Sequence, residues 1–194
     1  MGQEVVLFHS VLGLRPAVGV FADRLRAAGH IVHTPDILDG QVFDSLEDGG
    51  RMRDEIGIQQ LMRRAHTAIA DFPPEIVLAG FSMGASVAEL LAAWRPGTRA
   101  AILMHGAFAP ATFGIAAWPS VPVQIHYANG DRDVDVEQVM ALQTAVQASG
   151  ARVDVFGYEG GGHLFEDAEF EGHNAASAEL MCGRVLTFLG ELAG

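Results

Sequence analysis

Short runs of apolar residues recur along this chain, separated by longer segments with the pattern of helices. The runs are nearly continuous in Val, Ile and Leu and do not alternate with polar residues, which is typical of strands in a parallel sheet covered on both faces. The helical segments must supply those covers. We therefore expect an α/β fold with strands at Glu4–His9, Ile31–Thr34, Ile76–Ala79, Ala100–Met104, Val121–Tyr127 and Arg152–Phe156.

The segments between the strands predict a doubly wound arrangement, a mostly parallel sheet of about six strands flanked by helices on both faces. Helices are expected at Pro16–Ala28, Met52–Asp71, Met83–Trp94, Val134–Ala148 and Asn174–Leu192. The chain has 194 residues, of which 49% are hydrophobic, and no linker or charge block divides it. We therefore expect residues 1–194 to form a single domain.

The most informative motif is Gly80-Phe81-Ser82-Met83-Gly84, which lies between an apolar run and a helix-like segment. At a nucleophile elbow the chain leaves a buried strand, turns sharply and begins a helix, and glycine on both sides gives the turn clearance. The central hydroxyl is then exposed rather than packed. The alternative interpretation of the same five residues is a tight strand-to-helix turn with an ordinary serine.

A serine hydroxyl is a weak nucleophile at neutral pH, so a catalytic Ser82 requires a histidine base and a carboxylate that orients it. His163 is the candidate base. It lies in the glycine-rich loop at residues 158–165, after an expected strand, and such a loop has no obvious structural need for histidine. The other seven histidines are interpreted as hydrogen-bonded scaffold or surface residues.

Three aspartates in the loop after the strand Val121–Tyr127 compete for the role of the acid. We assign it to Asp133, because Gly-x-x-Asp after a strand and before a helix start is where α/β-hydrolases usually carry this carboxylate. Asp131 is the second candidate. Asp135 is the expected N-cap of the following helix, which does not exclude a catalytic Asp133.

Ligands bind at the carboxyl ends of the strands in an open sheet of this kind. The polar residues at or just past such ends are Ser10, Asp36, Ser82, His105, Asp133 and His163. Two irregular stretches, Ile37–Gly50 and Gly106–Pro119, leave the same rim and are expected to form the walls of a pocket. Aromatic residues in the second stretch favour a substrate with an uncharged, hydrophobic part, and Trp118 is the expected wall residue. Ser10, Asp36 and His105 are further candidates for the lining.

Five segments resemble, in order and spacing, the signature segments of the dienelactone hydrolase family within the α/β-hydrolase superfamily. They are Phe8–Leu14, Thr34–Asp36, Gly80–Gly84, Gly130–Asp133 and Gly162–Phe165, which together span nearly the whole chain. The resemblance implies a compact α/β-hydrolase fold and a triad of Ser82, His163 and Asp133. It also implies an oxyanion hole formed by the backbone N–H groups of Met83 and Val11.

Three departures from the family pattern bear on the substrate. The founding enzymes use cysteine at the elbow, whereas serine points to general ester chemistry. Ser10 stands where those enzymes carry a glutamate that partners the resting cysteine. Glu166 and Asp167 stand where they carry an arginine for a substrate carboxylate, so we expect an anionic lactone to be repelled there. Arg51 and Arg53 could supply positive charge, although a solvated helix start is the simpler interpretation.

The formal net charge of −12, with only 12 Lys and Arg residues, argues against nucleic acid or an anionic membrane as partner. No phosphate-binding glycine motif or metal-spaced His/Cys cluster occurs, so we predict no cofactor and no metal. The single Cys182 lies among apolar neighbours and is interpreted as a buried structural thiol. Because no internal disulfide is possible and no signal segment is seen at the start, we expect a cytoplasmic enzyme acting on a small molecule.

The sequence thus predicts a serine hydrolase that cleaves a small carboxylic ester or lactone through an acyl-enzyme on Ser82. A thioesterase or a cofactor-free perhydrolase would use the same residues, because the choice of leaving group and nucleophile depends on pocket shape. The hypothesis from a different class is a non-catalytic ligand-binding protein with a hydrolase fold. Such a protein should not react with a fluorophosphonate probe.

Overall fold

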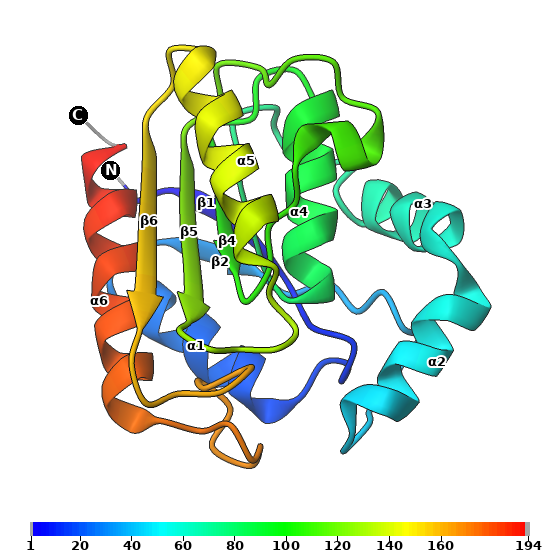
Figure 1. Cartoon of the computed structure of the whole chain (residues 1–194). Helices are drawn as coiled ribbons and strands as arrows, with labels where there is room; N and C mark the ends of the chain where they lie inside the picture. Colours follow the sequence, from blue (N-terminus) through cyan, green and yellow to red (C-terminus); the bar gives the residue numbers. More distant parts are fainter. Residues whose placement is uncertain (1, 193–194) are drawn as a thin grey trace.

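Six strands form one sheet in the order β2-β1-β3-β4-β5-β6, and every neighbouring pair is parallel (Figure 1). The structure is a computed structural model that describes residues 2–192. The strands are β1 (Glu4–Phe8), β2 (Ile31–His33), β3 (Val77–Phe81), β4 (Ala100–Met104), β5 (Val123–Ala128) and β6 (Val153–Tyr158). The α/β architecture predicted from the apolar runs is confirmed.

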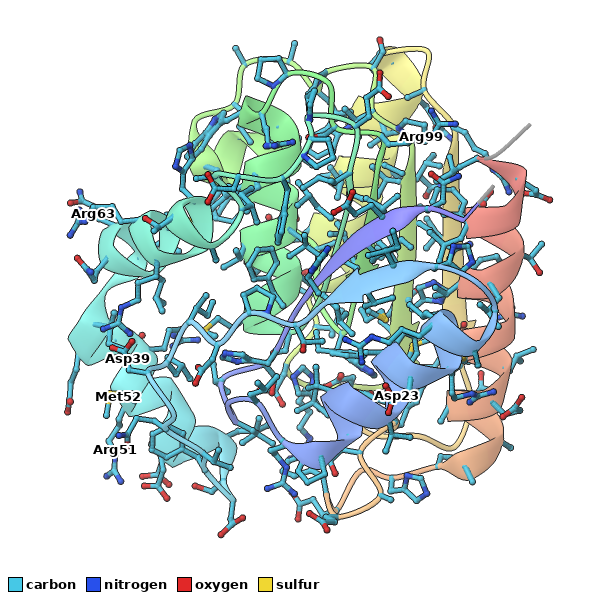
Figure 2. All side chains as sticks on the ribbon, turned by 180° about the vertical axis from the view of Figure 1, so that it is seen from behind. Asp23, Asp39, Arg51, Met52, Arg63 and Arg99 are labelled. Carbon is cyan, nitrogen blue, oxygen red and sulfur yellow. The ribbon has the colours of Figure 1, made fainter. Side chains whose placement is uncertain are left out.

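Helices cover both faces of this sheet (Figure 1). One face carries α1 (Pro16–Ala27) and α6 (Ala175–Glu191), and the other carries α3 (Ile58–Ala68), α4 (Met83–Trp94) and α5 (Val136–Ala148). Alternate residues of each strand enter two separate cores, so that Val6 packs on the α3–α5 side and Val5 on the α1–α6 side. Both are fully buried, which explains why the strands show no polar alternation. Figure 2 shows side chains filling the space on both faces.

The strand order reverses at β1, which places the functional segments together. The chain runs from β1 to β2 on one side and then crosses to β3 on the other side of β1. A reversal of this kind leaves a crevice at the carboxyl ends of the two central strands. Phe8 of β1 is in register with Gly80 of β3, so the segments that follow these two residues leave the sheet side by side.

The segment 52–71 forms two helices, and our prediction of one helix there is wrong. α2 (Leu46–Ile56) begins inside the stretch 37–50 that we expected to be irregular, because the Ser45 side chain caps it by accepting a hydrogen bond from the Asp48 N–H. Gly57 has a φ of 76° and separates α2 from α3, since a right-handed helix cannot continue through a positive φ. The other predicted helices and strands lie within two residues of the observed bounds.

The stretch 106–119 contains one short 3₁₀ helix, η1 (Pro110–Phe113). Cys182 of α6 is buried in the α1–α6 core, as predicted, and burial raises the pKa of its thiol. Over residues 2–192, no helix combines the length and hydropathy needed to cross a membrane.

Candidate active site

Ser82 lies at the turn between β3 and α4, with a φ of 52° and a ψ of −111°. A positive φ is rare for a residue other than glycine and is typical of functional sites. Close contacts explain the two flanking glycines: a Cβ at Gly80 would lie 2.1 Å from the Gly84 carbonyl oxygen, and a Cβ at Gly84 would lie 2.4 Å from the Phe8 carbonyl oxygen. The start of α4 therefore packs directly on the end of β1, and Ser82 lines a cavity at this edge of the sheet.

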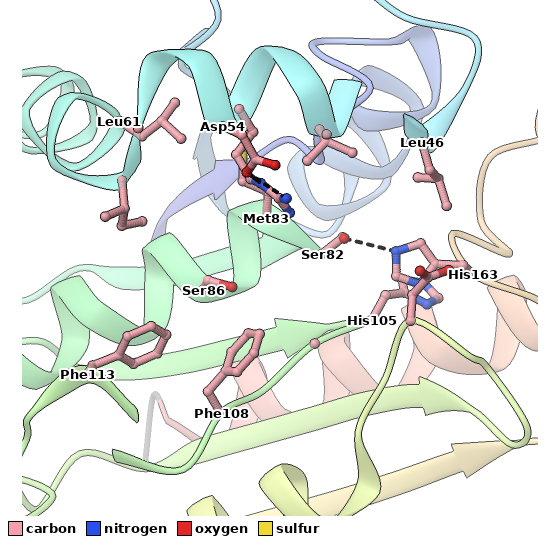
Figure 3. A pocket seen from close by; sticks show the side chains of 17 residues that line it. Leu46, Asp54, Leu61, Ser82, Met83, Ser86, His105, Phe108, Phe113 and His163 are labelled. Atoms are coloured by element: carbon pink, nitrogen blue, oxygen red, sulfur yellow. Dashed lines mark hydrogen bonds and ion pairs between the residues drawn. The ribbon is translucent and has the colours of Figure 1, made fainter. Parts of the chain in front are cut away.

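Ser82, His163 and Asp131 form a continuous chain of hydrogen bonds. The Ser82 hydroxyl lies 2.9 Å from His163 Nε2 (Figure 3), and His163 Nδ1 lies 2.8 Å from Asp131 Oδ2. With Nδ1 donating to the carboxylate, Nε2 is the nitrogen that accepts from the hydroxyl. The side chains of His163 and Asp131 are only 6% and 2% exposed, so the pair is largely shielded from water.

The carboxylate in contact with His163 is that of Asp131, and our assignment of Asp133 to this position is wrong. β5 runs one residue further than predicted, to Ala128, and a turn follows in which Gly130 has a φ of 81° and the Asp131 N–H donates to the Ala128 carbonyl. This turn directs Asp131 to the histidine. Asp133 stands on the cavity wall, and its N–H donates to Asp131 Oδ1 at 3.0 Å. Asp135 caps α5 as predicted.

Asp131 is held in its ionised form. Burial acts to raise the pKa of this carboxyl, but the hydrogen bond and charge of His163, the Asp133 N–H and the nearby His105 outweigh burial, and the pKa lies below its ordinary value. An ionised carboxylate at Nδ1 fixes the tautomer of His163 and favours its protonated form once Nε2 takes up a proton.

The two backbone N–H groups expected to form an oxyanion hole, those of Met83 and Val11, belong to residues that line the cavity beside Ser82. Neither N–H donates a hydrogen bond to another group within the described part of the chain. The Val11 segment is fixed from both sides. Ser10 Oγ accepts from the Leu12 N–H at 3.1 Å, and a Cβ at Gly49 of α2 would lie 2.3 Å from the Val11 carbonyl oxygen. Both donors are thus available to an oxygen bound at Ser82.

The cavity has a volume of about 630 Å³ and two kinds of wall. Its apolar part is formed by Leu46, Ile58, Leu61, Phe108 and Phe113, and its charged part by Arg53, Asp54 and Asp133. Figure 3 shows the phenylalanines facing the helices α2 and α3 across α4. Leu46 and Gly50 come from the stretch 37–50 that was expected to form a wall, whereas the contribution of Ile58 and Leu61 of α3 was not predicted.

Three of the four tentative lining residues lie outside the cavity. Trp118 is 4% exposed in the core, where its Nε1 donates to the Val121 carbonyl at 2.9 Å. Asp36 accepts hydrogen bonds from the N–H groups of Leu38 and Gly40 and so shapes its own loop. Ser10 is buried beneath the segment that carries Val11. These side chains satisfy local hydrogen bonds, which sequence position alone does not reveal.

His105 lines the cavity as expected, and its ring forms a hydrogen bond with the Glu166 carboxylate. Its φ is 60°, and its Nε2 lies 2.7 Å from Glu166 Oε2. The ring packs edge-on against His163, with 5.5 Å between centroids, and against Phe165, with 4.5 Å. Glu166 is therefore engaged by His105, and its buried side chain does not line the cavity.

Asp167 forms an ion pair, with 2.6 Å between its Oδ2 and Arg15 Nε. Neither Glu166 nor Asp167 lines the cavity, so the expected repulsion of an anionic lactone by these two side chains does not arise at its wall. Arg53 lines the cavity, paired with Asp54, whereas Arg51 pairs with Asp48 and lies on the outer side of α2 (Figure 2).

Donor atoms of His105, Asp131 and His163 lie within 4.8 Å of one another, a set that a metal ion could use. Both ring nitrogens of His163 are already engaged, by Asp131 and by Ser82, and one nitrogen of His105 is engaged by Glu166. Hydrogen bonding therefore accounts for the positions of Asp131 and His163, whereas Nδ1 of His105 is buried without a partner among the described residues.

An open parallel sheet with a serine at the turn after a central strand, in contact with a histidine from the loop after the last strand, defines an α/β-hydrolase. The sequence profile of the dienelactone hydrolase family matches residues 2–193. The chain belongs to the dienelactone hydrolase family and is a carboxylic ester hydrolase, so the resemblance seen in the five segments is confirmed.

The curated relatives of this chain are named as carboxymethylenebutenolidases. A protein of Aquifex aeolicus to which carboxymethylenebutenolidase activity is assigned is 25% identical over 177 residues, covering 84% of this chain and 77% of the relative. A protein of Escherichia coli with the same assignment is 25% identical over 127 residues, covering 61% of this chain and 47% of the relative. The chain thus matches about half the length of the second relative.

Solved structures share the fold. A dienelactone hydrolase-like promiscuous phosphotriesterase from metagenomic libraries superposes with a TM-score of 0.83 at 22% identity, covering 98% of this chain and 86% of that one. Esterase 2 of Thermogutta terrifontis superposes with a TM-score of 0.69 at 18% identity, covering 98% and 84%. At sequence identities of 22% and 18%, the similarity shows that the three chains share a fold.

Proposed function

We propose that this protein hydrolyses a small carboxylic ester or lactone through an acyl-enzyme on Ser82. The observation that carries the proposal is the uninterrupted chain of hydrogen bonds from Ser82 Oγ through His163 to Asp131, with distances of 2.9 and 2.8 Å. A hydroxyl, an imidazole and an ionised carboxylate in this order form the arrangement that activates serine in acyl transfer.

In the first half of the reaction, Ser82 Oγ attacks the substrate carbonyl carbon and His163 Nε2 takes up the hydroxyl proton. The carbonyl oxygen becomes an oxyanion, which the N–H groups of Met83 and Val11 would stabilise by donating to it. His163 then returns the proton to the leaving alkoxide, and the alcohol departs. In the second half, water attacks the acyl group with its proton going to the same nitrogen, and Ser82 is restored with release of the carboxylic acid.

The walls of the cavity favour a substrate without net charge near the reacting carbonyl. Among residues 2–192, Arg53 is the one Lys or Arg side chain on the wall, and it is paired with Asp54, while Asp133 adds a second carboxylate. An anionic substrate would meet more negative than positive charge there. The apolar wall on the other side suits a hydrocarbon group.

The direct test is turnover of p-nitrophenyl butanoate by Ser82→Ala. We expect kcat to fall by at least about 10⁴-fold, because removal of the nucleophile leaves only binding and the oxyanion donors. Ser120→Ala is the matched control: Ser120 is exposed and donates to the Ser149 carbonyl, outside the cavity, so this variant should keep wild-type turnover. Retention of activity by Ser82→Ala would contradict the proposal.

A further inference from the structure

Ser82 is the N-cap of α4, and Ser86 lies in the first turn of this helix and lines the same cavity. The Ser86 N–H donates to the Ser82 carbonyl, so the two residues are one helical turn apart, about 6 Å. Figure 3 shows both side chains at the cavity, with that of Ser86 lying on the side of Phe108. A group bound covalently to Ser82 can therefore reach the Ser86 hydroxyl without a change in the backbone.

The Ser86 hydroxyl differs from those of Thr144 and Thr187, which lie on the helices α5 and α6. Serine and threonine in helices commonly donate to the carbonyl four residues earlier. Thr144 donates to the Met140 carbonyl at 2.8 Å, and Thr187 donates to the Gly183 carbonyl at 3.0 Å. Within residues 2–192, the Ser86 hydroxyl makes no such bond and no other hydrogen bond, although its N–H donates to the Ser82 carbonyl at 3.2 Å. This half-buried donor remains available to a bound molecule.

The geometry of the reaction places the acyl part of the substrate beside Ser86. The leaving oxygen must receive its proton from His163 Nε2, so the alcohol part lies on the side of His163. In Figure 3, His163 and Ser86 lie on opposite sides of the Ser82 hydroxyl. The acyl part must therefore extend away from His163, along α4, into the part of the cavity lined by Phe108, Phe113 and Leu61.

The length of the acyl chain needed to reach Ser86 follows from simple dimensions. An extended chain advances about 1.2 Å per bond, as the length of about 3.5 Å for the three bonds of an amino-acid residue implies. A hydrogen bond to Ser86 adds about 2.8 Å between oxygens. Of the separation of about 6 Å between two residues one turn apart, about 3 Å then remains for the chain. This is about three bonds from Ser82 Oγ and places the oxygen on the second or third carbon of the acyl group, the ester carbonyl being the first.

We propose that Ser86 selects acyl groups that carry a hydroxyl or carbonyl oxygen on the second or third carbon, the ester carbonyl being the first. This inference rests on the proposed acyl-enzyme at Ser82. The surrounding walls are apolar, so a chain without such an oxygen leaves the Ser86 donor unpaired when it covers the cavity. A single donor in an apolar channel therefore discriminates between acyl chains of equal length.

The test compares p-nitrophenyl butanoate with p-nitrophenyl 3-hydroxybutanoate, which differ by one hydroxyl group. The quantity measured is the ratio of kcat/KM for the hydroxy ester to that for the plain ester, in the wild type and in Ser86→Ala. Dividing the two ratios cancels the intrinsic reactivity of the esters. We expect the ratio to fall by about 3- to 10-fold in Ser86→Ala, the range set by one neutral hydrogen bond. Thr144→Ala, an exposed helical hydroxyl on α5, should leave the ratio unchanged.

The outcomes separate this inference from the function on which it rests. If both esters are turned over and the ratio is the same in the wild type and in Ser86→Ala, the selection by Ser86 is wrong and the esterase activity stands. If neither ester is turned over and Ser82 does not react with a fluorophosphonate, the proposed function itself fails. A ratio that falls equally in Thr144→Ala would also overturn the role of Ser86, because that hydroxyl lies outside the cavity.

Discussion

Arg15 and Asp167 form a buried ion pair, with 2.6 Å between Arg15 Nε and Asp167 Oδ2 and side chains only 7% and 6% exposed. Arg15 precedes α1, shortly after the segment that carries Val11, and Asp167 lies shortly after His163. The pair thus joins the loop that would supply an oxyanion donor to the loop that supplies the histidine. The acidic residue that the sequence alone suggested as a repulsive feature is a structural connection.

Removal of Arg15 should destabilise the protein. Arg15→Ala leaves the Asp167 carboxylate buried without its partner, and we expect a loss of about 2–3 kcal/mol in the free energy of unfolding, measured with urea. The exposed pair of Arg24 and Glu179 is the comparison, and Arg24→Ala should cost less than about 1 kcal/mol. Equal effects of the two substitutions would show that the buried pair has no special role.

Substitutions of Asp131 and Asp133, the two candidate acids in the loop after β5, should have clearly different effects on kcat. Asp131→Asn keeps the size of the side chain but removes the charge at His163 Nδ1, and we expect kcat to fall by about 10³- to 10⁴-fold, as for the acid of other triads. Asp133→Asn keeps the N–H that donates to Asp131, so its effect should be less than about 10-fold. The reverse order would restore the assignment made from sequence.

Most of the fold could be predicted because each buried strand and its following helix carry local signals. The observed bounds of α4 and β4 are those predicted, since both are apolar and end at clear breaks. The break at Gly57 was missed because a helical pattern on both sides conceals a single positive φ. The capping Ser45 was overlooked for a similar reason, because the helix that it starts is mostly exposed and polar.

The site could be predicted in part. Ser82 and His163 follow from motif and order, but the choice between Asp131 and Asp133 depends on where β5 ends and how the next turn is built, which the pattern fixes only within a residue or two. Trp118 is buried in the core on the α3–α5 side of the sheet and does not line the cavity. Such long-range packing leaves no mark in local sequence.

Glu89 should make stability depend on pH. It is fully buried on α4, Oε2 accepts from the Phe108 N–H at 3.0 Å, and burial raises the pKa of its carboxyl to about 8. The folded state therefore retains a proton that the unfolded chain loses above its ordinary value of 4.5. The stability that Glu89 contributes is fully present below that value and is lost as pH rises towards about 8.

The substitution Glu89→Gln tests this pH dependence of stability. It removes the titrating carboxyl group but keeps a side-chain oxygen that can accept from the Phe108 N–H. We expect the variant to gain stability relative to the wild type between pH 5 and pH 8, with a difference in slope of up to about 1.4 kcal/mol per pH unit. The measurement is the free energy of unfolding of both proteins across this range. Parallel curves would mean that Glu89 is ionised in the folded protein throughout.

Gly84 should not tolerate a side chain. A Cβ there would lie 2.4 Å from the Phe8 carbonyl oxygen and 2.6 Å from that of His9, so Gly84→Ala must push α4 away from β1. We expect a loss of at least about 2 kcal/mol in stability together with reduced turnover, because the Met83 N–H moves with the helix. Gly183→Ala is the control: Gly183 lies in α6 with nothing near its Cβ position, and alanine should stabilise that helix by about 0.5–1 kcal/mol.

The most direct test of the central claim is to locate the adduct that a fluorophosphonate forms on the wild-type protein, by mass spectrometry of its peptides. Ser82 should carry the phosphonyl group, and His163→Ala should slow the labelling by at least about 10³-fold, because the hydroxyl then has no base. An adduct on another residue, such as Ser86, or ester turnover that persists after complete labelling of Ser82, would contradict the account.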